Sequence, residues 1–454
     1  MGQMDGSEVN REGSRSLRVA GAFFLLAIAA HHQALGHAFT WNDGVNLVDN
    51  DAIRSTSNIP SFFISAWGSE AADDTYRERN SQYWRPIALT VWTVVYALGG
   101  LSPALFHALS LLLHGLAAAV VALLAYRLWP RPGPYRDGAL LGAAIWAVHP
   151  VHSEVVQVVS YQSDLLAGLS VILGLYLWVR AEGLSVRGRR WTRRLVIPMC
   201  YAIGEGSKEM AVMLPALLVM LDWATSSHTE TLKTRALDLL PTVAVGLGYL
   251  WVRQMLLAPG GHRFFGDASG LEILWTMLDV VALYGRLLLA PWPLNPFYDW
   301  SVLPVQPSLF ALGPLLGLGC LIGCLWAAFQ LRRRDRRLAI CLLLPWVAML
   351  PVSHIIPIII AAAERFLYIA SIGPLLLLGI GLRHSTSAPV RRIMATCLLG
   401  LFLSLSVIRS LDWRTDRTIL EANVRDWPTS FNAHYGLAQL HEREERFEEA
   451  AKLF

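Results

Sequence analysis

The sequence predicts an all-α fold, in which a polytopic bundle of membrane helices is followed by a short helical hairpin. Of the 454 residues, 54% are hydrophobic and only 16% are charged, whereas a soluble domain carries about 25% charged residues. Many apolar stretches approach the roughly 20 residues that a helix needs to cross a bilayer. After Arg409 the composition changes abruptly to charged and helix-forming. These observations separate a membrane domain from a polar C-terminal tail.

The pattern of charges argues against a nucleic-acid-binding protein, and the positions of the cysteines argue against reactive thiols. The net charge is +4 and there are five cysteines. The cations cluster in short loops, as charges that orient membrane helices do, and they form no continuous basic face, so no nucleic-acid partner is expected. The cysteines fall in apolar segments, which predicts inert buried thiols.

The chain begins with a polar stretch, 1–16, that we expect to be a cytoplasmic tail because it carries Arg11 and Arg15. The apolar stretch from Leu17 to Gly36 is too long for the core of a signal peptide and has no clear small-residue cleavage site. It is therefore interpreted as an uncleaved first span.

Thirteen apolar segments are candidates for spans, and arginine decides which of them cross. If all crossed, the arginines within 127–136 and 180–194 would face outside, against the positive-inside rule. Both groups become cytoplasmic if 84–100 and 271–290 lie on the outer surface as interfacial helices. The candidates are 17–37, 84–100, 104–127, 138–149, 162–180, 194–205, 208–224, 236–256, 271–290, 309–331, 338–352, 366–382 and 390–410.

The prediction is therefore about eleven spans with a cytoplasmic N-terminus and a periplasmic or lumenal C-terminus. The membrane is the bacterial inner membrane, or that of the endoplasmic reticulum if the source is eukaryotic. The stretch 194–224 is left open, as two short spans or one broken span.

Three regions follow from this topology. Residues 17–410 form the membrane domain, with a first outer loop at 38–103, and 411–454 form the tail. In the tail, small and large residues between Ala433 and Phe454 have the spacing of a tetratricopeptide repeat that stops before it is complete. One repeat cannot bury its own face, so either the tail packs on the membrane domain or the sequence is a fragment of a longer protein. The alternative is an unrelated amphipathic hairpin.

Four polar clusters from distant parts of the chain map to the outer face. Each has a plain structural explanation, such as a solvated loop acid, an ion pair at a helix kink, or an arginine that snorkels to the interface. Their convergence predicts a site at the membrane–water boundary instead. The clusters are Asn42 with Asp43, His149 with His152 and Glu154, Lys208 with Glu209, and Glu364 with Arg365.

The spacing of His149 and His152 suggests a metal ligand pair. A zinc site needs three or four ligands with supporting groups, and none is evident in the sequence around this pair. No cofactor is therefore expected, and a divalent metal is the minor alternative.

The motifs, taken as an ordered set, resemble a known family. The chain is similar to the transmembrane and tetratricopeptide-repeat O-mannosyltransferases and their bacterial relatives, which have the GT-C glycosyltransferase fold. The motifs are Trp41-Asn42-Asp43, Arg85-Pro86, Phe106-His107 with His114, HPVHSE at 149–154, SDLLAG at 163–168, SKE at 207–209 and ERFLY at 364–368.

The resemblance implies transfer of a sugar, mannose by family analogy, from a polyprenyl-phosphate carrier to an acceptor hydroxyl. The acceptor is expected to be a protein or peptide serine or threonine, presented on the outer side by the tail, and membrane lipids surround the enzyme. The implied roles are Asp43 as the catalytic acid–base residue, Arg365 and Lys208 as ligands of the donor phosphate, His152, Glu154, Asn42 and His149 as groups that position acceptor or sugar, and Asp164, Glu209 and Glu364 as supporting carboxylates.

Two positions depart from the family pattern. The family commonly has two adjacent acids where this chain has Asn42-Asp43, and an arginine where this chain has Gln162. The second change removes one candidate phosphate ligand.

Two other functions stay open. A lipid or sugar transporter predicts charges at mid-membrane on inverted repeats, and no such repeat is visible. A membrane-anchored scaffold that binds partners through its repeats needs only one span. Spatial convergence of Asp43, Glu154 and Arg365 favours the enzyme over both.

Overall fold

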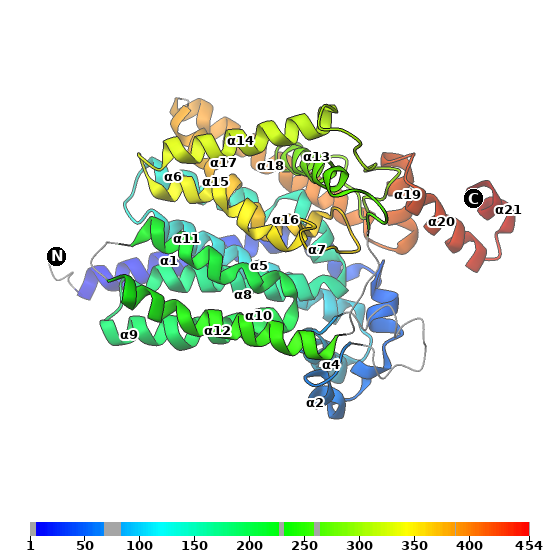
Figure 1. The fold of residues 1–454 in the computed structure, drawn as a ribbon, viewed down its shortest axis with the longest axis horizontal. Coiled ribbons are helices and arrows are strands. Elements are labelled where there is room, and N and C mark those ends of the chain that lie inside the picture. The colour runs from blue at the N-terminus through cyan, green and yellow to red at the C-terminus, as the bar shows by residue number, and fades with distance from the viewer. Residues whose placement is uncertain (1–5, 68–82, 227–230, 258–263, 386, 454) are drawn as a thin grey trace.

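The fold is helical throughout the part of the chain that the structure describes. The structure is a computed structural model that describes residues 6–67, 83–226, 231–257, 264–385 and 387–453, and no strand occurs among them. Figure 1 shows long helices lying side by side along one axis, with the N-terminus at one end and the C-terminus at the other. The predicted all-α bundle is confirmed.

The helices differ widely in length, from single turns near the loops to long apolar rods. In chain order they are α1 (Gly6–His31), α2 (Ile59–Phe62), α4 (Pro86–Gly99), α5 (Pro103–Leu128), α6 (Pro134–Ala147), α7 (Ser153–Gln157), α8 (Gln162–Ala181), α9 (Val186–Trp191), α10 (Ile197–Ser207), α11 (Leu214–Thr225), α12 (Leu232–Leu256), α13 (Gly270–Leu289), α14 (Leu312–Leu331), α15 (Arg336–Ala348), α16 (Leu367–Ala370), α17 (Ile372–Ser385), α18 (Ala388–Asp412), α19 (Asp416–Asp426), α20 (Phe431–Arg443) and α21 (Phe447–Leu453).

Six helices in the described residues are long and apolar enough to cross a membrane, and eight if each of two bent pairs is one span. The bent pairs are Pro134–Ala147 with Pro150–Gln157, at 45°, and Glu364–Ala370 with Ile372–His384, at 63°. The chain is thus a multi-pass membrane protein. The count of about eleven spans stays a prediction.

The stretch 194–224 forms two helices that run in opposite directions. Lys208 is extended, with φ −160° and ψ 139°, and so ends α10 before the chain turns back into α11. Arg193, before α10, and Asp222, near the end of α11, interact electrostatically, so both lie at the same end of the bundle. Of the two alternatives, the hairpin of short helices is therefore the observed one.

Glycines let α6 and α17 approach closely. A Cβ on Gly142 would lie 2.3 Å from the carbonyl oxygen of Leu375, and a Cβ on Gly379 would lie 2.2 Å from the carbonyl oxygen of Gly138. Contacts at these distances are possible only without side chains. Small residues at crossings are typical of membrane helices, which gain little from the hydrophobic effect inside lipid.

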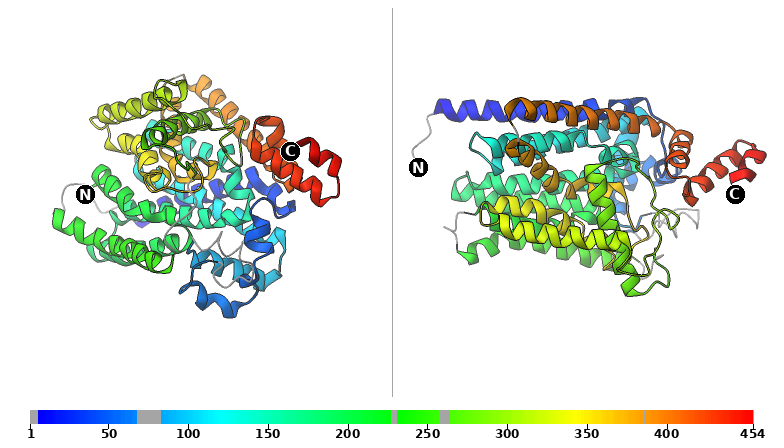
Figure 2. Two further views of the ribbon diagram at one scale, coloured as in Figure 1. Left: turned by 45° about the vertical axis from the view of Figure 1, so that its right-hand side comes forward. Right: turned by 90° about the horizontal axis from the view of Figure 1, so that it is seen from above.

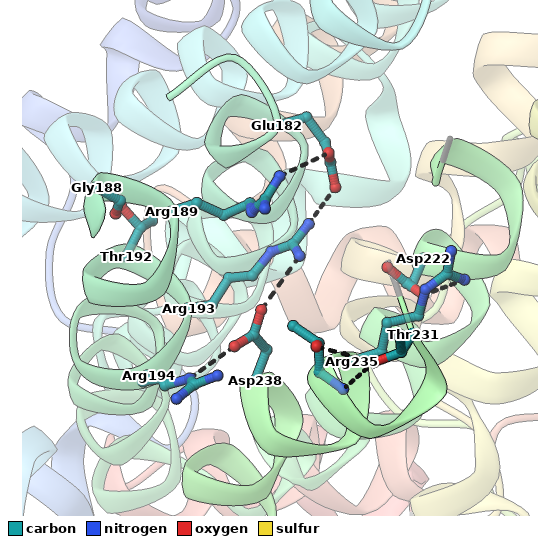
Figure 3. Close-up of polar contacts among 11 residues, drawn as sticks. Glu182, Gly188, Arg189, Thr192, Arg193, Arg194, Asp222, Thr231, Arg235 and Asp238 are labelled. Carbon is teal, nitrogen blue, oxygen red and sulfur yellow. Dashed lines mark hydrogen bonds and ion pairs between the residues drawn. The ribbon is translucent and has the colours of Figure 1, made fainter. Parts of the chain in front are cut away.

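An ion-pair network joins the end of α8, the segment 192–196 before α10, and α12 at the end of the bundle near the N-terminus (Figures 1 and 3). The Arg193 side chain is fully buried and lies 4.1 Å from the Trp178 ring centroid. It pairs with Glu182 and with Asp238, the latter at 3.4 Å, and Arg194 also pairs with Asp238, at 2.7 Å. A buried arginine is retained only when it is paired in this way.

The first outer loop has a small core of its own at the opposite end of the bundle. The core gathers around the fully buried Trp92 of α4, against Phe106 of α5. The indole nitrogen of Trp92 donates to Gln162 at 3.1 Å, and the amide of Gln162 donates to the Phe106 carbonyl at 2.7 Å and to Ser110 at 3.0 Å. Gln162 therefore anchors α4 to the bundle.

The C-terminal tail packs on the membrane domain. Asp299, in the loop between α13 and α14, accepts hydrogen bonds from the side chain of Ser430 and from both the backbone and side-chain nitrogens of Asn432, at 2.9 to 3.2 Å. These donors lie at the N-terminus of α20. The Trp427 indole donates to the Leu294 carbonyl at 3.1 Å. In both views of Figure 2 the terminal hairpin of α20 and α21 projects from that end of the bundle, and its assignment as a tetratricopeptide repeat stays a prediction.

Candidate active site

A cluster of buried charges lies where α7, α8 and α10 meet the segment before α16. Glu154 and Arg365 come from the two bent helix pairs, and both side chains are buried. The Arg365 guanidinium pairs with Glu154, and the Arg365 backbone N–H donates to the same carboxylate at 2.7 Å. The Arg365 Nε is buried and has no partner among the described residues. This arginine is held in place and keeps one donor free.

A second ion pair joins Lys208 to Asp164. The ammonium donates to the carboxylate at 2.5 Å, and both side chains are almost completely buried. Lys208 reaches Asp164 because the break between α10 and α11 is extended at this residue. The role of Asp164 as a supporting carboxylate stays a prediction, and this contact is consistent with it.

A third ion pair corrects the predicted partner of Glu209. Its two carboxylate oxygens accept a two-pronged pair of hydrogen bonds from Arg85, at 2.6 and 3.1 Å. Arg85 also lies 4.4 Å from the Tyr83 ring centroid. The sequence places Glu209 beside Lys208, as an ion pair at a helix kink or as a supporting carboxylate, and it places Arg85 only in a motif. The planar fork of arginine matches a carboxylate better than a lysine ammonium does.

Tyr161 lies at the centre of the cluster and was missed by sequence reasoning. The Arg365 guanidinium is 4.3 Å from its ring centroid, and the Lys208 ammonium is 5.9 Å away. Its hydroxyl accepts a hydrogen bond from the Asn42 side chain at 3.0 Å. Asp43 also interacts with it electrostatically. The available signal was an aromatic residue directly before the apolar helix that carries the SDLLAG motif.

Asp43 is fully buried beside this cluster. Its carboxylate accepts backbone hydrogen bonds from Ser160 at 2.7 Å, Val159 at 3.1 Å and Thr40 at 3.2 Å. Burial raises the pKa of Asp43 to about 7, against the opposing effect of these hydrogen bonds. A carboxyl with this pKa can exchange a proton near neutral pH.

Two predicted positioning residues face the helix core instead of the charges. His152 is hydrogen-bonded to the Ser371 hydroxyl at 3.2 Å and lies 4.7 Å from the Trp146 ring. His149 is hydrogen-bonded to the Leu288 carbonyl at 3.2 Å and packs on the Phe402 ring. Their contacts are those of packed core residues, and nothing in them supports a role at the sugar.

Glu364 also turns away from the cluster, although its neighbour Arg365 belongs to it. It accepts hydrogen bonds from the Asn295 backbone at 2.5 Å and the Tyr298 hydroxyl at 3.3 Å. Both donors belong to the loop on which the tail packs. Glu364 therefore supports the loop between α13 and α14, and it supports the site only through its neighbour.

The cluster balances its own charge. Three cations each face one carboxylate, so the described side chains hold no excess positive charge before a ligand arrives. In the described ranges, no group of three or more His, Cys, Asp or Glu side chains is arranged to hold a metal ion. The residues that the fold brings together are Asn42, Asp43, Arg85, Glu154, Tyr161, Asp164, Lys208, Glu209 and Arg365.

Fold and site together define a multi-pass membrane protein with a buried ionic cluster at one end of its bundle. The chain resembles the protein O-mannosyl-transferases of the TMTC type over nearly its whole length. It is 24% identical to human TMTC4 over 91% of this chain and 62% of that protein, and 22% identical to F38B6.6 of Caenorhabditis elegans over 96% and 62%. Mouse TMTC3 is 22% identical over 94% of this chain and 49% of its own length.

The chain thus spans about half to three fifths of the length of these relatives. No protein-family model matches it. Among solved structures, ArnT from Cupriavidus metallidurans, bound to undecaprenyl phosphate, is similar with a TM-score of 0.45 and 14% identity, over 95% of this chain and 73% of that one.

Proposed function

We propose that this protein is a membrane glycosyltransferase of the GT-C type that moves a sugar from a polyprenyl-phosphate carrier to an acceptor hydroxyl on the extracytoplasmic side. The observation that carries the proposal is the meeting of Asp43, Tyr161, Lys208 and Arg365 in one buried cluster. A scaffold needs no such cluster. A transporter would need charges that line a path, whereas here each cation is held by a carboxylate.

The donor phosphate binds to the free side of Arg365. Glu154 holds the guanidinium through one nitrogen, and the unpartnered Nε donates to a phosphate oxygen. Lys208 adds a second positive charge across the Tyr161 ring. As the bond from the anomeric carbon to the phosphate oxygen breaks, negative charge grows on the phosphate, and these cations stabilise it.

The acceptor hydroxyl attacks the anomeric carbon from the opposite side, so the configuration is inverted. Its proton passes to Asp43, whose pKa of about 7 suits a base at neutral pH. Asp43 is covered by the backbone of Ser160 and Val159. The mechanism therefore requires the 158–160 turn to move aside when an acceptor is bound.

The acceptor is a serine or threonine of a protein, and the sugar is mannose, as the names of the curated relatives suggest. The tail packs at the end of the bundle where the first outer loop also lies. It presents the polypeptide at that end.

The test is an assay of the purified chain with a panel of labelled polyprenyl-phosphate sugars and serine-containing peptides. We expect the unmodified chain to transfer label to the peptide. The Arg365→Gln variant should lose 10²- to 10³-fold in kcat. Arg383→Gln removes an arginine that is one-third exposed and paired with Asp137 outside the charge cluster, so this control variant should retain full activity. Equal activity of Arg365→Gln and the control would refute the assignment.

A further inference from the structure

Two groups of arginines lie beside each other at the N-terminal end of the bundle, and they differ in their partners. The first is the network of Figure 3, in which Arg189, Arg193, Arg194 and Arg235 face Glu182, Asp222 and Asp238. Each arginine of that group has a carboxylate partner. The second group follows α14, and its hollow includes Trp223, the residue directly after Asp222.

Three arginines of the second group lack a carboxylate. Arg332, Arg333 and Arg334 are exposed, and within the described ranges none of them forms an ion pair. The acid that follows them in the chain, Asp335, pairs with Arg337 at 2.8 Å. The three arginines line a surface hollow together with Trp223, Asp335 and Arg336. The hollow therefore carries positive charge that the protein itself does not balance.

The position of the hollow relates it to the lipid headgroups. The candidate span Leu312–Leu331 ends at the residue before Arg332, so these arginines are the first groups beyond the apolar layer. The Arg332 guanidinium lies 4.2 Å from the Phe329 ring centroid, and Phe329 is 49% exposed. Trp223, which also lines the hollow, is 38% exposed. Exposed aromatic rings beside arginines suit the boundary between acyl chains and headgroups.

We infer that this hollow is a binding site for the phosphate headgroup of an anionic phospholipid. Arg333 and Arg334 contact the phosphate, and Phe329 and Trp223 contact the first part of the acyl chains. Each arginine close to an anionic lipid surface strengthens binding about fivefold. The inference is independent of the glycosyltransferase activity, because the hollow is built from other elements than the charge cluster.

The test compares two variants that each lose two exposed arginines at the same end of the protein. Arg333→Gln with Arg334→Gln removes the hollow's charges, and Arg187→Gln with Arg190→Gln in α9 is the matched control. Phosphatidylglycerol is titrated into each purified full-length chain in neutral detergent, and bound lipid is counted by native mass spectrometry. Phosphatidylcholine is titrated in parallel.

We expect the hollow variant to bind phosphatidylglycerol roughly 20- to 30-fold more weakly than the unmodified chain, at about fivefold per arginine. The control variant should bind it as the unmodified chain does, and phosphatidylcholine should not distinguish the three. Equal loss in both variants would mean bulk electrostatics only and would overturn the site. Displacement of the lipid by inorganic phosphate at matched ionic strength would overturn the lipid as its ligand.

Discussion

At the scale of single residues, the site depends on pairs that hold each cation still. Arg365, Lys208 and Arg85 each face a carboxylate, so their side chains are ordered before a donor arrives. Removing one partner of a buried pair typically costs about 3–5 kcal/mol. Variants at either partner of a pair will therefore mix loss of stability with loss of function, and Tyr161, which is not an ion-pair partner, is the cleaner target.

Asp43 should give transfer a pH dependence. Burial raises its pKa to about 7, so the basic form is scarce below that pH. The transfer rate should rise about tenfold per pH unit up to about 7 and then level off. Asp43→Asn should lose 10²- to 10⁴-fold in rate, while Asp49→Asn, an exposed aspartate of the same loop, should keep both rate and profile. A rate that is flat between pH 5 and 8 would contradict the role of Asp43 as the base.

The raised pKa of Asp43 also affects stability, but stability changes with pH in the opposite direction to the transfer rate. The folded state keeps a proton on Asp43 at pH values where the unfolded chain has lost it. The free energy of unfolding therefore falls as the pH rises from the ordinary pKa of an aspartate towards about 7. Activity and stability can thus be separated in one pH series.

Tyr161 should act mainly through its ring. Tyr161→Phe keeps the face that Arg365 covers at 4.3 Å and removes only the hydroxyl that accepts from Asn42. We expect at most a few-fold change in the KM for the donor. Tyr161→Leu removes the ring and should raise that KM roughly 5- to 30-fold, as a buried cation–π contact predicts. Equal effects of the two variants would show that the ring contact is unimportant.

At the scale of helices, breaks decide where the polar residues lie. The bends at 45° and 63° bring Glu154 and Arg365 together, and the extended residue between α10 and α11 directs Lys208 to Asp164. The lengths of the apolar stretches in the sequence indicate that the helices carrying these residues are short or interrupted. Which interrupted ends meet depends on how the helices pack side by side.

Asp299 should hold the tail to the membrane domain. Its carboxylate satisfies donors at the first turn of α20, where a negative charge is also favoured by the helix dipole. Asp299→Ala should increase hydrogen exchange in the first turn of α20 at least tenfold, with α5 unchanged. The exposed Asp267→Ala is the matched control. Unchanged exchange in α20 would show that other contacts anchor the tail.

At the scale of the whole molecule, the two ends of the bundle have different chemistry. One end carries arginine groups and the N-terminus, and the other carries α2, α4 and the tail. The charge cluster belongs to this second end, because Lys208 follows α10 at the opposite end of that helix from Arg193. This separation agrees with an active site on one side of the membrane and orienting charges on the other.

Sidedness can be measured with single cysteines in a cysteine-free background. In intact cells, without permeabilisation of the membrane, a membrane-impermeant maleimide should label Ser57→Cys in the first outer loop and Ile356→Cys in the loop before α16. Arg187→Cys in α9 should react only after permeabilisation. All three positions are exposed, so access is not limited by burial. Labelling of positions 57 and 356 from opposite sides would refute the proposed site.

The sequence by itself determined the class of protein, because apolar length, arginine-rich loops and the change in composition after Arg409 are local properties of the chain. It also located most of the cluster, since Asp43, Glu154, Lys208 and Arg365 stand in short polar motifs between apolar segments. The tertiary structure decided the partners. It gave Glu209 to Arg85, placed Tyr161 at the centre and turned His149 and His152 into the core. Those outcomes depend on the rotation and packing of helices far apart in sequence, and no local pattern encodes them.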